Sequence, residues 1–276
     1  MIYTPFSPDA SIAPYIETIF HYEQFVPDHS IERVVPTGHV FILFELDDCP
    51  RHTFDNKTLQ ANASYQHAFI SGMHRNYISI SAQENSEMLA VQFKPFGSYP
   101  FLHEQTNMIN ELIVPAHEIV GEELYDLRND MKASDNTEEK FRLIEQWLME
   151  RFDANKTPPG DIVQFVDRLQ AEPVNSLNEL IAGYPASQKT LIAEFKKFVG
   201  LTPKYYQRIL RFNDLLKRLK NKEEVSWTEI AHDCGYFDQS HFIKEFKHFS
   251  GFNPREFILN DFNKEDTNFF PLDRQA

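Results

Sequence analysis

The chain has 276 residues, of which 42% are hydrophobic, and it carries 27 Lys and Arg against 41 Asp and Glu, a net charge of −14. Such an acidic balance argues against nonspecific nucleic-acid binding by the whole chain, and the length predicts two domains. Residues 1–156 hold 11 basic and 24 acidic side chains, residues 157–260 hold 14 and 13, and residues 261–276 hold 2 and 4. We therefore expect an acidic N-terminal domain over 1–156, a near-neutral domain over 157–260 and a polar tail over 261–276.

The two cysteines, Cys49 and Cys234, lack the paired spacing of metal or redox motifs. This usage excludes a disulfide framework and is typical of a reducing compartment. The sequence shows no apolar run of membrane-spanning length and no secretory signal. We therefore expect a cytoplasmic protein without membrane contact.

The first hundred residues predict short strands, because runs rich in Ile, Val, Phe and Tyr alternate with turn residues. The predicted strands are Ile19–Tyr22, Ile31–Val35, Val40–Leu46, His67–Ser71, Tyr77–Ser81 and Met88–Phe93. This pattern indicates a β-sandwich or barrel.

After Pro100 the pattern becomes helical. Asn136, with Glu139 three residues later, resembles a capping box, and an apolar stripe at helical spacing runs from Phe141 to Phe152. That stripe fits a dimer interface anchored by Trp147 and internal packing equally well. Residues 153–160 end in Pro-Pro-Gly and are the predicted linker.

The last third of the chain contains an internal repeat. Residues 195–206 return at 246–257 with Phe, Lys, Phe, Gly and Pro at the same spacing. A unit of about fifty residues that occurs only twice is too short for a solenoid, so we interpret it as a duplicated helical module.

Each copy predicts a helix, a short turn and a second helix. The first helices start with the capping boxes Ser176–Glu179 and Ser226–Glu229, and the second helices with the caps Ser187 and Asp238. In the second copy, Gly235 fits a helix end that needs positive φ. The apolar stripes of the second helices consist of Leu191, Phe195 and Phe198, and of Phe242, Phe246 and Phe249.

A helix from Thr202-Pro203 to about Lys220 should join the copies. It could hold the modules roughly 34 Å apart, one turn of duplex, so that one chain reads two successive major grooves. Its basic residues should stay outside: Lys204, Arg208, Arg211, Lys217, Arg218, Lys220 and Lys222.

Residues 175–260 resemble the DNA-binding domain of the AraC/XylS family of bacterial transcription regulators. The resemblance is carried by Ile230-Ala231, Gly235-Tyr236, Asp238 to Phe242, Phe246-Lys247, Gly251 to Pro254 and Phe257. It implies a sequence-specific regulator with double-stranded DNA and RNA polymerase as partners. The contacts that it implies fall on Ser187, Gln188, Lys189, Thr190 and Ile192, and on Gln239, Ser240, His241 and Lys244.

The first copy departs from the family pattern, with Ile181 in place of the usual Ala and Pro185 in place of the turn Gly. We expect its turn to differ and its contribution to be shape and phosphate contacts more than base reading. The N-terminal half more loosely resembles the cupin-like regulatory domain found ahead of such modules, at residues 12–15, 34–38 and 91–97. The predicted fold class is thus α+β, a cupin-like sandwich with trailing helices followed by an all-α domain.

Function in the N-terminal half stays open. Its strand aromatics fit a core or an effector pocket, and its histidines lack metal-ligand spacing, so we expect no metal and no cofactor. No nucleophile elbow, HExxH, P-loop or kinase signature occurs, which predicts a non-enzyme. The alternatives are a cupin-like small-molecule or metal-dependent protein that binds DNA secondarily, and a DNA-binding protein without an effector. A homodimer, the effector, the operator and the choice between activation and repression stay open.

Overall fold

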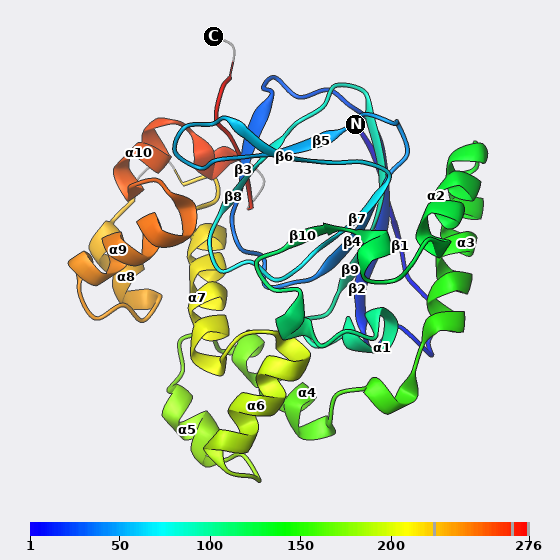
Figure 1. Ribbon diagram of the computed structural model, residues 1–276. Coiled ribbons are helices and arrows are strands. Elements are labelled where there is room, and N and C mark those ends of the chain that lie inside the picture. Colours follow the sequence, from blue (N-terminus) through cyan, green and yellow to red (C-terminus); the bar gives the residue numbers. More distant parts are fainter. Residues whose placement is uncertain (223–224, 266–267, 275–276) are drawn as a thin grey trace.

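The computed structural model describes residues 1–222, 225–265 and 268–274. A β-rich half and a helical half lie side by side, with helix α7 next to the sheets (Figure 1). Their buried apolar residues form one continuous cluster. The two halves are therefore packed together and are not separated by an open linker.

The β-rich half consists of two antiparallel sheets. The larger has the order β1-β2-β9-β4-β7-β10 and comprises β1 (Ile2–Phe6), β2 (Ile16–Phe25), β9 (Ser86–Phe93), β4 (Phe41–Glu45), β7 (Ala68–Ser71) and β10 (Ile113–Pro115). The smaller has the order β11-β3-β8-β5-β6 and comprises β11 (Phe269–Pro271), β3 (Ile31–Val34), β8 (Ile78–Ser81), β5 (Arg51–Phe54) and β6 (Ala61–Tyr65). The sandwich prediction is confirmed, and each of the six predicted strands occurs, while β1, β5, β6, β10 and β11 were not predicted.

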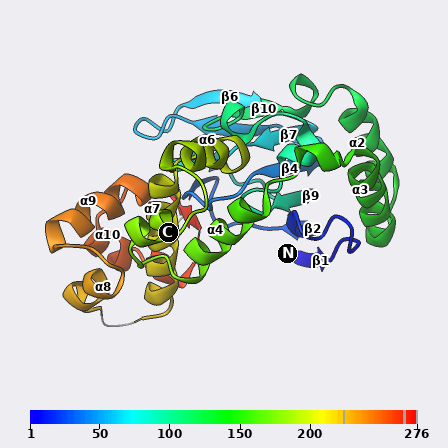
Figure 2. The same ribbon diagram turned by 90° about the horizontal axis from the view of Figure 1, so that it is seen from below.

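Short helices and a helical hairpin follow the sheets. They are α1 (Tyr99–Leu102), η1 (Thr106–Met108), η2 (Ala116–Glu118), α2 (Glu123–Ala133), α3 (Thr137–Arg151) and η3 (Ala154–Lys156). The hairpin α2–α3 covers the side of the sandwich that faces away from the helical half (Figure 2).

The apolar stripe of α3 is an internal packing face. Phe141, Ile144 and Leu148 are buried, and the Phe141 ring stacks on Phe6 of β1 at 4.8 Å between centroids. Trp147 is half-buried, and its indole N–H donates to Glu123 of α2 over 3.2 Å. Asn136 does cap α3, but its side chain accepts from the Glu138 backbone, so the predicted box with Glu139 does not form.

The helical half contains both predicted helix-turn-helix units. Its helices are α4 (Gly160–Ala171), α5 (Leu177–Ala182), α6 (Gln188–Val199), α7 (Pro203–Leu219), α8 (Trp227–Asp233), α9 (Gln239–Ser250), α10 (Pro254–Leu259) and η4 (Phe262–Lys264). The pairs α5/α6 and α8/α9 are joined by the single helix α7 (Figure 1). The fold-class prediction is therefore confirmed for this half as well.

Most of the local capping predictions are confirmed. Ser187, Asp238 and Thr202 accept hydrogen bonds from the third residue of α6, α9 and α7 respectively. Gly235 has the expected positive φ, 71°. Ser176 and Ser226 do occupy N-cap positions, but their side chains make no capping bond, so the two predicted boxes are wrong.

The segment after α10 is more than a polar tail. Phe262 and Phe270 are buried, and β11 pairs with β3 in the register Phe269 to Val34, Phe270 to Arg33 and Pro271 to Glu32. The chain thus returns from the helical half to add an edge strand to the smaller sheet. Burial of the Phe262 and Phe270 rings against α10 stabilises this segment, even though the residues around them are charged.

Candidate nucleic-acid interface and inter-sheet cavity

The predicted DNA contacts lie on α6 and α9 and at their N-caps. Of the nine, eight are exposed and only Ile192 is partly buried: Ser187, Gln188, Lys189, Thr190, Ile192, Gln239, Ser240, His241 and Lys244. The two caps spend part of their hydrogen-bonding capacity within the protein, because Ser187 bonds Thr190 and Asp238 accepts from the His241 backbone over 2.7 Å. The exposed amide of Gln239 and the ammonium groups of Lys189 and Lys244 have the chemistry that reads base edges.

A buried aromatic cluster fixes the second recognition helix. Phe242, Phe246 and Phe249 of α9 are at most 1% exposed. Trp227 of α8 tilts against Phe242, and Phe212 of α7 packs on Phe246 and Phe249. Burial of three rings ties one face of α9 to α7 and α8, which leaves the opposite face free for a partner.

Two arginines of α7 bind groups of the second module, although the sequence placed them outside. Arg208 forms a two-bond pair with Glu245 of α9, at 2.9 and 2.6 Å. Arg211 donates to the Gly235 carbonyl oxygen over 3.3 Å and lies over the Tyr236 ring. Arg218 pairs with Asp214 one turn earlier. Arg208 and Arg211 hold the second module on α7, so they are positioning groups, whereas Arg218 pairs within α7 itself.

The first module has a turn of its own kind. Gly183 ends α5 with φ −86°, in contrast to the left-handed Gly235 of the second turn. Tyr184 crosses to α6, where its hydroxyl donates to Glu194 over 2.7 Å, and its ring meets Phe165 of α4 edge-on. The expected difference between the turns is therefore present, and it rests on a tyrosine anchor.

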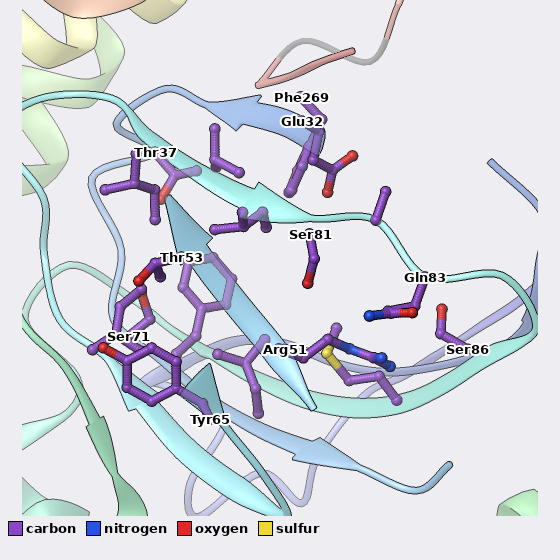
Figure 3. Close-up of a pocket in the computed structure, with 18 of the residues that line it drawn as sticks. Glu32, Thr37, Arg51, Thr53, Tyr65, Ser71, Ser81, Gln83, Ser86 and Phe269 are labelled. Carbon is purple, nitrogen blue, oxygen red and sulfur yellow. The ribbon is translucent and has the colours of Figure 1, made fainter. Parts of the chain in front are cut away.

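A cavity of about 460 Å³ lies between the two sheets. Figure 3 shows side chains from both sheets converging on it. Of the predicted strand aromatics, Phe20, Tyr22, Phe41 and Phe69 line the cavity, whereas Phe44 and Phe93 are fully buried core residues. The strand aromatics therefore contribute both to the core and to the cavity lining, the two roles that the sequence left open. A volume of this size and a largely apolar lining are typical of small-molecule sites.

One end of the cavity is polar. The Arg51 guanidinium pairs with Glu45 and, at 2.5 Å, with Asp47. Burial raises the pKa of the Glu45 carboxyl to about 7, although the neighbouring Arg51 charge opposes that shift. Gln83 and Ser86 also line this end (Figure 3). No sequence signal pointed to these residues, because they come from separate strands and loops.

Three possible metal ligands, His21, Glu23 and Glu87, come together on the β2–β9 pair. A positive charge already neutralises this group, because the Lys140 ammonium lies 3.0 Å from the Glu87 carboxylate. His21 also bonds Glu87 over 2.9 Å and Thr137 over 3.2 Å. The ammonium would repel a metal ion at this carboxylate, so we interpret the group as an ion-pair network that holds α3 on the sheet.

Comparisons with known proteins agree with this architecture. A family model described as a helix-turn-helix domain matches residues 182–259, and a domain of unknown function, DUF6597, matches residues 4–115. No helix within the described ranges is long and apolar enough to cross a membrane.

Three curated relatives carry regulator names. The uncharacterized HTH-type transcriptional regulator YidL of Escherichia coli is 30% identical over 43% of this chain and 41% of its own. The probable transcriptional regulator LumQ of Photobacterium leiognathi is 23% identical over 71% of this chain and 76% of its own. The transcriptional activator RhaS of Pectobacterium carotovorum is 32% identical over 28% of each chain. The match spans less than half the length of YidL and of RhaS.

The likeness to these regulators rests on the C-terminal domain. The matched region contains α6, α7, α8, α9 and α10, and thus both recognition helices with the helix that joins them. It also contains the repeated Phe-Lys, Gly and Pro frame at 195–203 and 246–254. Residues 182–259 therefore form a double helix-turn-helix domain similar to that of the AraC/XylS family.

Proposed function

We propose that the protein is a sequence-specific DNA-binding transcription regulator. The observation that carries this proposal is the pair of recognition helices α6 and α9, each with a buried aromatic face and an exposed polar face. Recognition helices of this motif place their N-terminal residues against base edges in the major groove. One chain would then read two successive grooves, with double-stranded DNA as its partner.

We assign base contacts to Gln188, Lys189, Gln239 and Lys244, and supporting contacts to Ser187, Thr190, Ile192, Ser240 and His241. Ser187 and Thr190 bond each other at the start of α6, which supports a backbone-positioning role for that pair. Tyr236 meets the His241 ring edge-on, so the imidazole direction is partly fixed. The first copy, with its remodelled turn, would contribute more to position than to sequence.

The same proposal gives the cavity of the sandwich to a small-molecule effector. RNA polymerase and a second copy of the chain are further partners consistent with a regulator of this family. The group of His21, Glu23 and Glu87 gives no support to the cupin-like enzyme alternative, because the Lys140 ammonium already pairs with the Glu87 carboxylate. Metal analysis of the purified protein would revive that alternative if it found stoichiometric metal.

Genomic fragments selected by the protein, followed by gel shifts, test DNA recognition. Lys244→Ala and Gln239→Ala should each weaken specific binding by roughly tenfold to a hundredfold, the range for loss of one good base contact. Lys247→Ala is the matched control, since this exposed lysine lies in the last turn of the same helix. If both variants bind the selected fragments as tightly as the unaltered protein does, the contact assignment fails.

A further inference from the structure

At the polar end of the inter-sheet cavity, Arg51 has a donor that lacks a partner among the described residues. Arg51 is 9% exposed, and its Nη2 pairs with Glu45 and Asp47. Its Nη1 is buried and has no hydrogen-bond partner in the described structure. A buried donor of a charged group costs free energy while it lacks an acceptor, so this atom marks the place where a ligand group would bind.

The charges around Arg51 select the kind of acceptor. Two carboxylates, Glu45 and Asp47, already surround the guanidinium, and a third negative group would lie beside both. A carbonyl or hydroxyl oxygen accepts from Nη1 without that repulsion. Most of the exposed lining is apolar, with Phe20, Phe41, Phe69, Ile80 and Met88 among its residues, although polar side chains such as Glu32, His52 and Ser81 also line it.

The wall of the cavity next to the helical half is the pair β3–β11, and it has two different faces. Glu32 and Val34 of β3 line the cavity, as do their partners Pro271 and Phe269 on β11. The paired residues between them, Arg33 and Phe270, point the other way, because side chains alternate along a strand.

That second face contacts the end of α9. Arg33 donates from Nη1 to the carbonyl oxygen of Ser250, the last residue of α9, over 3.2 Å. The Arg33 guanidinium is held between the rings of Tyr77 and Phe252, at 4.3 and 4.4 Å from their centroids. Phe270 packs on Phe257 of α10 at 5.0 Å. One strand pair therefore touches both the cavity and the second recognition helix.

We propose that the cavity binds a neutral amphipathic molecule, with an apolar ring-containing body and a carbonyl or hydroxyl head bonded to Arg51, and that β3–β11 transmits its presence to α9. This inference rests on the proposed function for its biological meaning. Ligand binding itself can be measured without DNA. A failure of the cavity proposal is thus distinguishable from a failure of DNA recognition.

The probe for the first test is prodan, a fluorescent aryl ketone built on dimethylaminonaphthalene, titrated into the full-length protein. Saturable binding with blue-shifted emission is expected. The parent dimethylaminonaphthalene without the ketone, and the corresponding naphthoic acid, should each bind about tenfold more weakly, the change expected for one lost or opposed hydrogen bond to a charged group. Equal affinity for all three compounds would refute the assigned head group.

Two variants locate the probe. Arg51→Met should abolish the preference for the ketone over the parent compound. Because that change also leaves Glu45 without its partner and could disturb folding, Ile80→Trp provides a second route by filling the cavity from β8. Ile243→Trp is its control, since Ile243 lies exposed on α9. If Ile80→Trp folds normally by circular dichroism and still binds prodan as before, the cavity is not the site.

Hydrogen–deuterium exchange tests the transmission. Prodan should slow exchange at least about threefold in residues 31–34 and at the C-terminal end of α9, because bound ligand restricts opening of the wall. Arg33→Gln should remove the response of α9 and keep that of β3. If the native protein binds prodan and α9 shows no response, β3–β11 does not transmit its presence.

Discussion

The pair Arg208–Glu245 gives a sharp test of how the second module is held. Arg208 of α7 donates from Nε and Nη2 to the two carboxylate oxygens of Glu245 on α9, and the side chains are only 24% and 12% exposed. Burial by itself would raise the pKa of Glu245, but the bonds from Arg208 hold it below its usual value. The guanidinium also lies over the Tyr205 ring.

Arg208→Gln should lower the free energy of unfolding by about 2 kcal/mol, because it leaves a half-buried carboxylate without its two-bond partner. A double-mutant cycle with Glu245→Gln should return a coupling energy of about 1–2 kcal/mol. Lys204→Gln, on the exposed first turn of the same helix, is the control and should change stability by less than about 0.5 kcal/mol. Urea unfolding measures the native protein and the four variants.

The same variants separate structure from DNA contact. One lost phosphate contact reduces the salt dependence of DNA binding by about 0.9 in logarithmic slope. Arg208→Gln should weaken DNA binding without changing that slope, because the arginine is already paired within the protein. A coupling energy near zero together with a slope reduced by about one would refute this reasoning and indicate that Arg208 contacts phosphate.

Three further changes have definite expected outcomes. Gly251→Ala should cost about 2–4 kcal/mol, because a Cβ there would lie 2.7 Å from the Tyr77 ring at a φ of +75°; Gly121→Ala shares the positive φ without a neighbour and should cost only about 1 kcal/mol. Phe270→Ala should cost about 3 kcal/mol in thermal unfolding, as for other buried phenylalanines. Glu87→Gln should remove about 1–2 kcal/mol at neutral pH, a loss that shrinks as the pH falls from about 4.5 towards 2.

The sign of the last effect follows from the folded protein. The bond from His21, and then the bond and charge of Lys140, lower the pKa of Glu87 to about 2. A lowered carboxyl pKa stabilises the fold above its unfolded value and ceases to do so below its folded value. A difference in unfolding free energy between the native protein and Glu87→Gln that stays constant from pH 5 to pH 2 would contradict this expected pH dependence. For the other changes, equal costs at Gly251 and Gly121, or a cost below about 1 kcal/mol at Phe270, would contradict the assigned packing.

The elements that the sequence predicted are those whose signals are local. Ser187, Thr202 and Asp238 act as caps because a short side chain needs only the helix that follows it. Ser176 and Ser226 occupy N-cap positions, but their side chains make no capping bond. Their ψ angles are 110° and 95°, against 152° to 169° at the four caps of this domain whose side chains do bond.

The remaining features depend on segments that meet only in the folded chain. Arg51 lines the cavity with Ser86, which comes from another strand, and neither has a neighbour in sequence that signals a site. Strand β11 has three residues and exists because β3 offers it a partner. The arginines of α7 looked like surface charge, since Glu245 lies thirty-seven positions away from Arg208. The sequence pattern therefore predicts the two modules, whereas the contacts that hold them on α7 and on the sandwich join residues far apart in sequence.

The internal repeat has a role beyond the helix ends that it builds. Its glycines, Gly200 and Gly251, occupy equivalent positions after α6 and α9, both with positive φ. Both also adjoin the sandwich: Asn110 donates to the Gly200 carbonyl oxygen, and Arg33 donates to that of Ser250, next to Gly251. A side chain at either glycine would collide with the same sandwich residue that makes the contact.

Each recognition helix is thus docked on the sandwich through the same point of the repeat, but by different partners. Thr106 adds a bond of 2.8 Å to the Phe198 carbonyl oxygen on the first copy, and η1 containing it is not part of the cavity wall. On the second copy the docking residue, Arg33, belongs to that wall. A movement of β3 would therefore shift α9 relative to α6, and two helices that must fit successive grooves are sensitive to such a shift. If ligand binding moves the cavity wall as proposed, this asymmetry directs its effect to the second module.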